Sequence, residues 1–280
     1  MNRRQGCLWP VWLCLVLAAC ARTPTVNSNV NNSNSNTNGN NNNSGSSGSY
    51  SSNESRIQAA AKINMQLGLG YLQEGNLPIA KEKLERARSM DPHNPEIHGA
   101  MALLDQRLGK DKDADKEFRT ALELDSHDPA MLNNYAVFLC SHERADEGVK
   151  YFEQAASNPL YPTPWAAYTN AGVCMRAVHR DAEAAQRFAR ALRANPAYSE
   201  AVYQSSDLDF QQHKLPDARF RIDVFLLTNP STPDLLLLAY RIAQAQNDVV
   251  GQQRYAARLA QEFPNSDQAH ALAASKINPG

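Results

Sequence analysis

The chain has 280 residues, 42% of them hydrophobic, and its 28 Lys and Arg residues nearly balance its 29 Asp and Glu residues. The resulting net charge of −1 gives no sign of the clustered basic surface that nucleic-acid binding would need. The length would suit one or two globular domains, but the chain contains an internal repeat. Its length therefore reflects the number of stacked repeats and not the number of domains.

The N-terminal residues have the pattern of a lipoprotein signal peptide. A basic Arg3-Arg4 pair precedes the apolar run Leu8–Leu17, which is shorter than the roughly 20 residues that a membrane-spanning helix needs. The run closes with the sequence LAAC, ending at Cys20, which resembles the bacterial lipobox. We predict that residues 1–19 are removed and that Cys20 is lipidated. Because Ala21 and not aspartate follows, we expect sorting to the outer membrane. The alternatives are an ordinary signal peptide or a membrane anchor.

Residues 20–54 are predicted to be a disordered tether rich in Asn, Ser and Gly. From residue 24 onward this segment has almost no apolar side chains. Such a segment cannot bury enough surface to offset the entropy of ordering the chain. Charge and apolar periodicity return near residue 55, so we predict that the folded domain covers residues 55–280.

A four-residue pattern recurs through the folded domain at a step of 34 residues. Its members in one repeat are Ala184, Phe188, Ala191 and Pro196, and toward the N-terminus the register needs one correction of two residues. A step of 34 residues is the tetratricopeptide (TPR) period, in which a tight turn joins two helices. We predict an all-α fold: a right-handed superhelix of six TPR repeats with a short C-terminal capping helix. The expected repeats are 61–94, 95–128, 129–164, 165–198, 199–232 and 233–266, and the cap is 267–276.

Small and large residues alternate at fixed positions of this repeat. The eighth position of the first helix is small in five repeats, for example Gly68 and Gly172, and is Tyr240 in the last. Residues such as Leu84 and Phe188 occupy the twenty-fourth position. We expect the small residue to let the two helices cross closely and the large one to fill the space beside it. A stack of this kind is a binding scaffold by default.

Two cysteines, Cys140 and Cys174, remain in the folded domain after Cys20 is lipidated. Both lie on the first helices of neighbouring repeats, which pack side by side. In an oxidising periplasm we expect a disulfide between them, and closing such a loop would stabilise the fold by about 3 to 4 kcal/mol. The alternative is two buried free thiols, because the spacing does not fix their separation.

No catalytic or metal-binding pattern accompanies the repeats. Seven histidines are scattered without HExxH spacing, and no cysteine or carboxylate cluster completes a metal set. A GxSxG elbow and a phosphate-binding glycine loop are also missing. We therefore predict a protein that is not an enzyme and that takes no cofactor, metal or small-molecule substrate.

A partner-binding groove is predicted on the first repeat. Positions two, five, nine and twelve of a first helix usually line the inner surface of a TPR stack. Here they are Lys62, Met65, Leu69 and Leu72, three of them apolar. An apolar row of this kind suggests a groove for a helix or an extended segment. The alternative is that a helix preceding Ile63 folds over these residues as a cap.

The segment around the irregular repeat carries a family resemblance. The turn Asn158-Pro159-Leu160-Tyr161-Pro162-Thr163-Pro164 is followed by Asn170-Ala171-Gly172 and Cys174. Together with the lipobox and the six repeats, this resembles the type IV pilus biogenesis and stability lipoproteins of the PilF/PilW family. The resemblance implies a pilotin: an outer-membrane lipoprotein facing the periplasm that binds secretin subunits of the pilus and promotes their localisation and multimerisation. The long Asn-rich tract is a departure from the family.

A second function from another class stays open at this point. By resemblance to other outer-membrane TPR lipoproteins, the protein would be a scaffold that recruits or activates a cell-envelope enzyme, such as a cell-wall synthase or hydrolase. The turn at residues 158–164 favours the pilus reading over this one.

Overall fold

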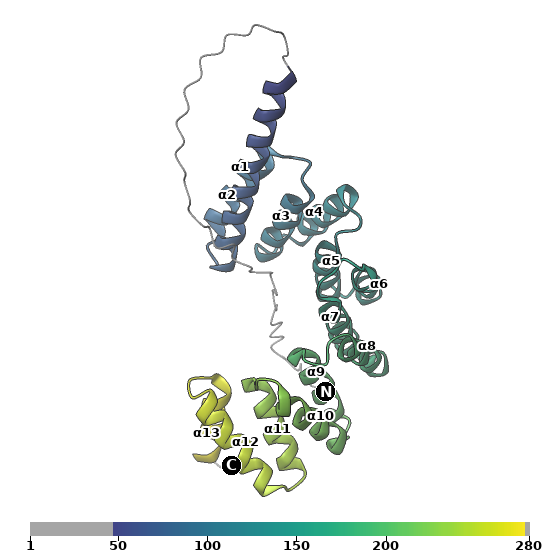
Figure 1. Cartoon of the computed structure of the whole chain (residues 1–280), viewed down its shortest axis with the longest axis vertical. Helices are drawn as coiled ribbons and strands as arrows, with labels where there is room; N and C mark the ends of the chain where they lie inside the picture. The colour runs from purple at the N-terminus through teal and green to yellow at the C-terminus, as the bar shows by residue number, and fades with distance from the viewer. Residues whose placement is uncertain (1–46, 278–280) are drawn as a thin grey trace, which may run out of the picture. The chain divides into compact units, whose positions relative to one another are not determined.

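The computed structural model of the protein describes residues 47–277. Within these residues the chain forms thirteen α-helices and no β-strand (Figure 1). The helices are α1 (Ser47–Gln73), α2 (Leu77–Met90), α3 (Pro95–Arg107), α4 (Asp111–Leu124), α5 (Pro129–Ser141), α6 (Ala145–Ser157), α7 (Pro164–Ala177), α8 (Asp181–Ala194), α9 (Ser199–Gln211), α10 (Leu215–Thr228), α11 (Pro233–Ala245), α12 (Val249–Glu262) and α13 (Asp267–Ile277).

Twelve of these helices form the six predicted pairs. Each odd-numbered helix from α1 to α11 packs against the helix that follows it, and each pair contacts the next pair along the chain (Figure 1). The all-α prediction of six TPR repeats followed by a short helix is therefore confirmed. Because contacts are made within a pair and with its neighbours, the apolar interior is spread along the array and not gathered in one core.

Local signals explain where the first helices of the repeats begin. Four of the six start at a proline, for example α3 at Pro95 and α5 at Pro129. Proline suits the first helical position because the N–H of a residue there has no partner within the helix, so proline loses no hydrogen bond by lacking it. The side chain of Asn94 accepts the N–H of Glu96, and that of Asp128 accepts the N–H of Ala130. These caps satisfy free donors at the helix ends.

The turn within every repeat has one residue in the left-handed conformation, always at the fifteenth position. In the first two repeats it is glycine, Gly75 and Gly109. In the other four it is Glu143, His179, His213 or Asn247, with φ between 57° and 62°. A non-glycine residue is sterically strained in this conformation. The packing of the two helices therefore fixes the turn, and glycine is not required.

The predicted contact between the eighth and twenty-fourth positions is present. A Cβ atom added at Gly68 would lie 2.6 Å from Cγ of Leu84, and one added at Gly172 would lie 2.4 Å from Cε1 of Phe188. Both large side chains are fully buried. The small residue on the first helix therefore leaves the space in which the large side chain of the second helix packs.

The two ends of the described region bear on the predicted boundaries. α1 begins at Ser47, so residues 47–54, which the sequence analysis assigned to the tether, are helical. Extending an existing helix is less unfavourable than starting one, which accounts for the longer helix. At the other end, α13 contacts α11 and α12 and buries Leu272 against them. Residues 1–46, which include the predicted signal peptide and most of the tether, lie outside the described residues.

A disulfide joins Cys140 of α5 to Cys174 of α7, with the two Cα atoms 5.7 Å apart. It therefore links the first helices of the third and fourth repeats. A Cβ atom at Gly148 of α6 would lie 2.6 Å from Sγ of Cys140. The sulfur consequently occupies space that only glycine leaves open on the neighbouring helix.

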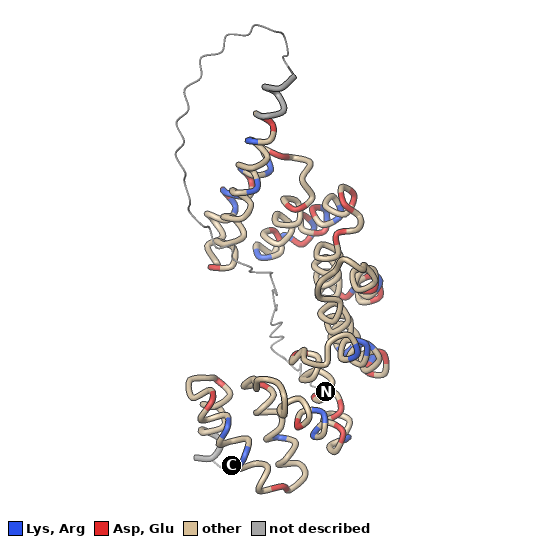
Figure 2. Tube along the Cα trace, in the orientation of Figure 1, with Lys and Arg blue, Asp and Glu red and all other residues tan. Residues whose placement is uncertain are grey.

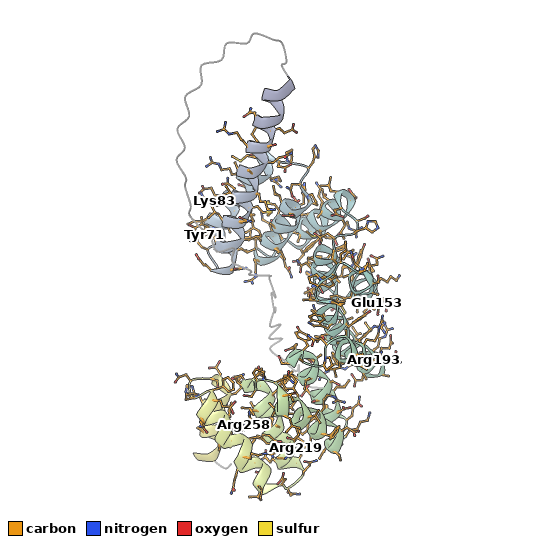
Figure 3. The ribbon with its side chains drawn as sticks, in the orientation of Figure 1. Tyr71, Lys83, Glu153, Arg193, Arg219 and Arg258 are labelled. Atoms are coloured by element: carbon orange, nitrogen blue, oxygen red, sulfur yellow. A yellow bond between two sulfur atoms is a disulfide. The ribbon has the colours of Figure 1, made fainter. Side chains whose placement is uncertain are left out.

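Ion pairs join the second helices of successive repeats. Figure 2 shows basic and acidic residues close together along these helices, and Figure 3 labels Glu153 and Arg193. The pairs are Arg88–Glu117 between α2 and α4, Arg144–Asp115 between the start of α6 and α4, Arg190–Glu153 between α8 and α6, and Arg254–Asp223 between α12 and α10. Over residues 47–277, no ion pair joins α8 to α10.

Asp115 is the centre of one of these networks. Its Oδ1 accepts hydrogen bonds from Arg144 (2.7 Å) and from the hydroxyl of Tyr135 (2.9 Å), and its Oδ2 accepts one from Arg119 (2.7 Å). Burial alone would raise the pKa of the Asp115 carboxyl, but these hydrogen bonds outweigh it and hold the pKa below its usual value. Burial and the bond to Asp115 raise the pKa of Tyr135 to about 12.

Replacing Asp115 by asparagine should destabilise the protein in a pH-dependent way. A carboxyl with a lowered pKa in the folded state stabilises above its unfolded pKa of about 3.9 and loses this effect as the pH falls through the folded pKa. We expect a loss of about 1 to 3 kcal/mol at pH 7, shrinking steadily below about pH 4. Thermal unfolding of wild type and variant from pH 7 down to pH 2.5 measures it.

Asp113→Asn is the matched control, because Asp113 is exposed on the same helix. It should change stability by less than about 0.5 kcal/mol at every pH. A difference between Asp115→Asn and wild type that stays constant from pH 7 to pH 2.5 would contradict the assignment.

Candidate partner-binding surface

The four residues predicted to line a groove on the first repeat do not share an exposed surface. Lys62 is exposed and Leu69 is half-buried, whereas Met65 and Leu72 are buried. The predicted groove is therefore wrong for Met65 and Leu72.

The next repeat covers these residues. α1 contacts α3, and Met65 and Leu72 share one buried cluster with Ile97 and Met101 of α3. In a stacked array the apolar face of one repeat is covered by its neighbour. The proposed cap is also wrong, because the residues before Ile63 continue α1 and do not fold back over it.

Two aliphatic side chains in the same part of α1, Ile63 and Leu67, are exposed instead. Ile63 is 57% exposed and Leu67 is 47% exposed. They are four residues apart and so lie on one side of the helix. No helix of the described region precedes α1, so no earlier repeat covers this side. We call Ile63 and Leu67 the α1 face.

A polar ladder crosses the first helices of the middle repeats. Asn170 of α7 donates to Asn133 of α5 at 3.1 Å, and Arg176 of α7 donates to Gln204 (2.8 Å) and Asp207 (2.7 Å) of α9. These bonds fix the positions of the three helices relative to one another. They also use much of the hydrogen-bonding capacity of these side chains, so a partner would have to compete with them.

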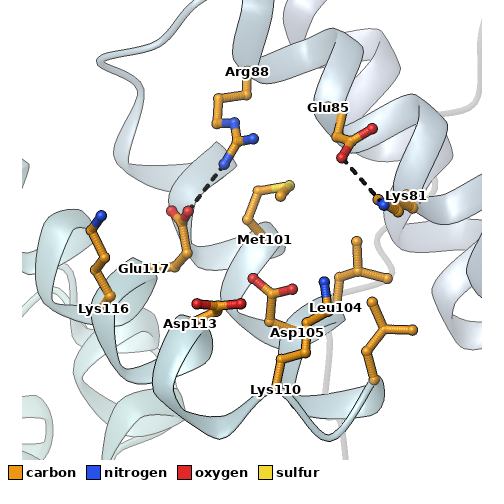
Figure 4. A pocket seen from close by; sticks show the side chains of 11 residues that line it. Lys81, Glu85, Arg88, Met101, Leu104, Asp105, Lys110, Asp113, Lys116 and Glu117 are labelled. Atoms are coloured by element: carbon orange, nitrogen blue, oxygen red, sulfur yellow. Dashed lines mark hydrogen bonds and ion pairs between the residues drawn. The ribbon is translucent and has the colours of Figure 1, made fainter.

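A cavity of about 250 Å³ lies between α2, α3 and α4 (Figure 4). Its lining has as many basic as acidic side chains. Arg88 pairs with Glu117 at 3.1 Å, Lys81 pairs with Glu85 at 3.7 Å, and burial raises the pKa of Asp105. Ligand pockets usually enclose roughly 300–1,000 Å³ and are mostly apolar. The cavity therefore fits a charged joint between the first two repeats better than a ligand site.

The turn at residues 158–164, which carries the family resemblance, connects the third and fourth repeats. Asn158 caps the C-terminal end of α6, accepts the N–H of Leu160 at 2.9 Å and donates to the carbonyl of His127 at 3.0 Å. Tyr161 packs against the buried cluster beneath it, while Leu160 is 85% exposed. Pro164 then begins α7. The turn thus places the extra two residues of this repeat at the surface without disturbing the helices.

The remaining site predictions concern metals and the membrane. Among the described residues, no group of three or more His, Cys, Asp or Glu side chains is arranged to hold a metal ion. None of the described helices combines the length and the hydropathy that crossing a membrane requires. Cys20, the predicted lipidation site, lies outside the described residues and stays a prediction.

The fold and its exposed helix faces define a TPR protein, a class built for binding other proteins. A tetratricopeptide-repeat family model matches residues 71–136. A solved structure of a TPR protein from Parabacteroides merdae, 17% identical, overlays with a TM-score of 0.57 and covers 82% of this chain and 93% of that one. At this identity the likeness shows the fold alone.

Two relatives narrow the class to one family. The type IV pilus assembly protein PilF of Pseudomonas aeruginosa is 32% identical over 202 residues, which cover 72% of this chain and 80% of PilF. Its solved structure matches 78% of this chain and 99% of its own length with a TM-score of 0.62. The crystal structure of PilW, described as a widely conserved type IV pilus biogenesis factor, is 28% identical, covers 76% and 98% of the two chains and gives the same TM-score. The chain belongs to this PilF/PilW family of type IV pilus biogenesis proteins.

Proposed function

We propose that this protein is a pilotin: an outer-membrane lipoprotein, anchored through Cys20 and facing the periplasm, that binds secretin subunits of the type IV pilus. The observation that carries the proposal is the 32% identity to PilF over 72% of the chain. The LAAC sequence ending at Cys20 supports the lipid anchor. In this proposal the protein acts by binding and takes no part in catalysis.

The α1 face is the proposed contact for the secretin subunit. Two large aliphatic side chains, Ile63 and Leu67, lie exposed on one side of the terminal helix. An amphipathic segment of a partner can cover such a face. Attachment to the membrane through Cys20 would raise the local concentration of bound subunits there without any additional contact.

The proposal predicts the amount of heat- and detergent-resistant secretin multimer in membranes. Cells without the protein should lose the multimer and accumulate secretin subunits in the inner membrane. Cys20→Ala should lower the amount of multimer, because the protein then binds subunits without delivering them. Ile63→Glu with Leu67→Glu should abolish the multimer while the protein itself stays folded. Immunoblots of separated inner and outer membranes measure all three.

Lys62→Glu is the matched control, because Lys62 is exposed on the same helix but is not apolar. It should leave the multimer unchanged. Multimer that is unchanged even in cells without the protein would overturn the pilotin proposal. It would favour instead a scaffold that recruits or activates a cell-envelope enzyme.

A further inference from the structure

The outward side of α10 differs from that of every other second helix in the array. Phe220, Val224 and Leu227 are 70%, 47% and 81% exposed, and their spacing of four and three residues puts them on one side of the helix. The buried residues of α10, Ala218, Ile222 and Phe225, lie on the opposite side. We call Phe220, Val224 and Leu227 the α10 stripe.

The repeat register shows that the stripe is not a general property of the fold. At the same three positions the second helices of the other five repeats carry only polar or charged residues. On the two helices that flank α10, they are Gln186, Arg190 and Arg193 of α8 and Arg254, Arg258 and Gln261 of α12. The apolar residues of α10 therefore do not serve the stacking of repeats, which the other five second helices achieve without them.

The end of α8 lies next to α10 in the stack, because Leu192 of α8 packs against the buried cluster that contains Ala218 and Ile222 of α10. The outward side of this part of α8 is basic. Glu153 is shared by Arg187 (2.8 Å) and Arg190 (2.6 Å). Arg193, one turn beyond Arg190 and labelled in Figure 3, is exposed and has no ion pair among the described residues. On the other side, Asp223 of α10 already pairs with Arg254 of α12. Three arginines of α8 therefore share a single paired carboxylate, that of Glu153, so this side of α8 carries a net positive charge.

We propose that the α10 stripe and Arg193 form a second docking surface, for an acidic amphipathic helix of another protein. The apolar side of such a helix would cover Phe220, Val224 and Leu227, and its carboxylates would face the arginines of α8. This surface is separate from the α1 face. The proposal for it does not depend on whether the α1 face binds a secretin subunit.

Two other occupants fit the charges less well. The chain outside the described region at its N-terminus, residues 1–46, contains no Asp or Glu to pair with the arginines. A second copy of the protein docked by the same surface would place Arg193 of one copy close to the like-charged arginines of the other. An acidic partner is the occupant that satisfies both the apolar stripe and its basic border.

The test uses the full mature chain with Cys20→Ala and two fluorescent 15-residue helical peptides. Both peptides carry leucines on one side; the remaining positions are mostly Glu in one and Lys in the other. Fluorescence anisotropy should show binding of the Glu peptide that weakens at least fivefold in 0.5 M NaCl. The triple variant Phe220→Gln, Val224→Gln and Leu227→Ser should bind it at least tenfold more weakly. Arg193→Glu should weaken binding at least threefold.

Leu160→Ser is the matched control, because Leu160 is an equally exposed aliphatic side chain elsewhere on the array, and it should bind the Glu peptide like wild type. Circular dichroism checks that each variant is folded. If the triple variant does not fold, binding by Arg193→Glu decides the test. Equal binding of the two peptides, or binding that survives both sets of substitutions, would overturn the proposal. So would stripe-dependent binding to phosphatidylethanolamine–phosphatidylglycerol vesicles without peptide binding, or a stripe-dependent dimer in sedimentation without peptide binding.

Discussion

Leu72→Glu is expected to unfold the N-terminal end of the array, whereas Leu67→Glu, five residues earlier on the same helix, should leave it folded. Leu72 is buried among residues of α1 and α3, and Leu67 is 47% exposed. Removing a buried leucine side chain costs about 2 to 5 kcal/mol, and burying an unpaired carboxylate adds to this cost. A surface substitution like Leu67→Glu usually changes stability by less than about 0.5 kcal/mol.

Hydrogen exchange is the measurement that separates these two variants, because a terminal repeat can open while the others stay folded. In Leu72→Glu the amides of α1 and α2 should lose their protection, and those of the disulfide-linked α5 and α7 should keep it. In Leu67→Glu all four helices should exchange as in wild type. Equal protection of α1 in the two variants would show that Leu72 lies on an exposed surface after all.

Removing the disulfide by Cys140→Ala with Cys174→Ala should lower the free energy of unfolding by about 3 to 4 kcal/mol. The two cysteines are 34 residues apart, so the bond closes a loop of nearly one repeat in the unfolded chain. It also ties α5 directly to α7, which makes the third and fourth repeats unfold together. Denaturant unfolding followed by circular dichroism gives the difference.

A reductant supplies the control for this second prediction. Dithiothreitol should destabilise wild type by a similar amount and should leave the double variant unchanged, because that variant has no bond left to reduce. If wild type unfolds at the same denaturant concentration with and without dithiothreitol, the bond does not stabilise the fold.

The family assignment and the contact surfaces rest on different kinds of information. The period, the turn at residues 158–164 and the LAAC sequence point to the family without any coordinates. The α1 face needed the structure, because the usual TPR register places Met65 and Leu72, and not Ile63 and Leu67, in the groove. In this chain α3 covers Met65 and Leu72, whereas within residues 47–277 no repeat precedes α1 to cover Leu67.

The α10 stripe could have been found from the sequence by comparing equivalent positions of the six second helices. The signal is a second helix with apolar residues on both sides, here Phe220, Val224 and Leu227 opposite Ala218 and Ile222. A search for periodicity misses the stripe, because such a search finds apolar residues that recur in every repeat and not those present in a single repeat. Exposure of the three side chains then had to come from the coordinates.

The sequence by itself determined the fold class, the number of repeats and the close packing of Gly172 on Phe188. The physical reason is that a repeat array is held by contacts between residues at a constant spacing, so the period already contains the packing. Only the tertiary structure decided which faces are open, since exposure depends on whether a neighbour lies against each helix. In the described part of the chain no repeat precedes α1 to cover Ile63 and Leu67, and on α10 the stripe points away from the stack.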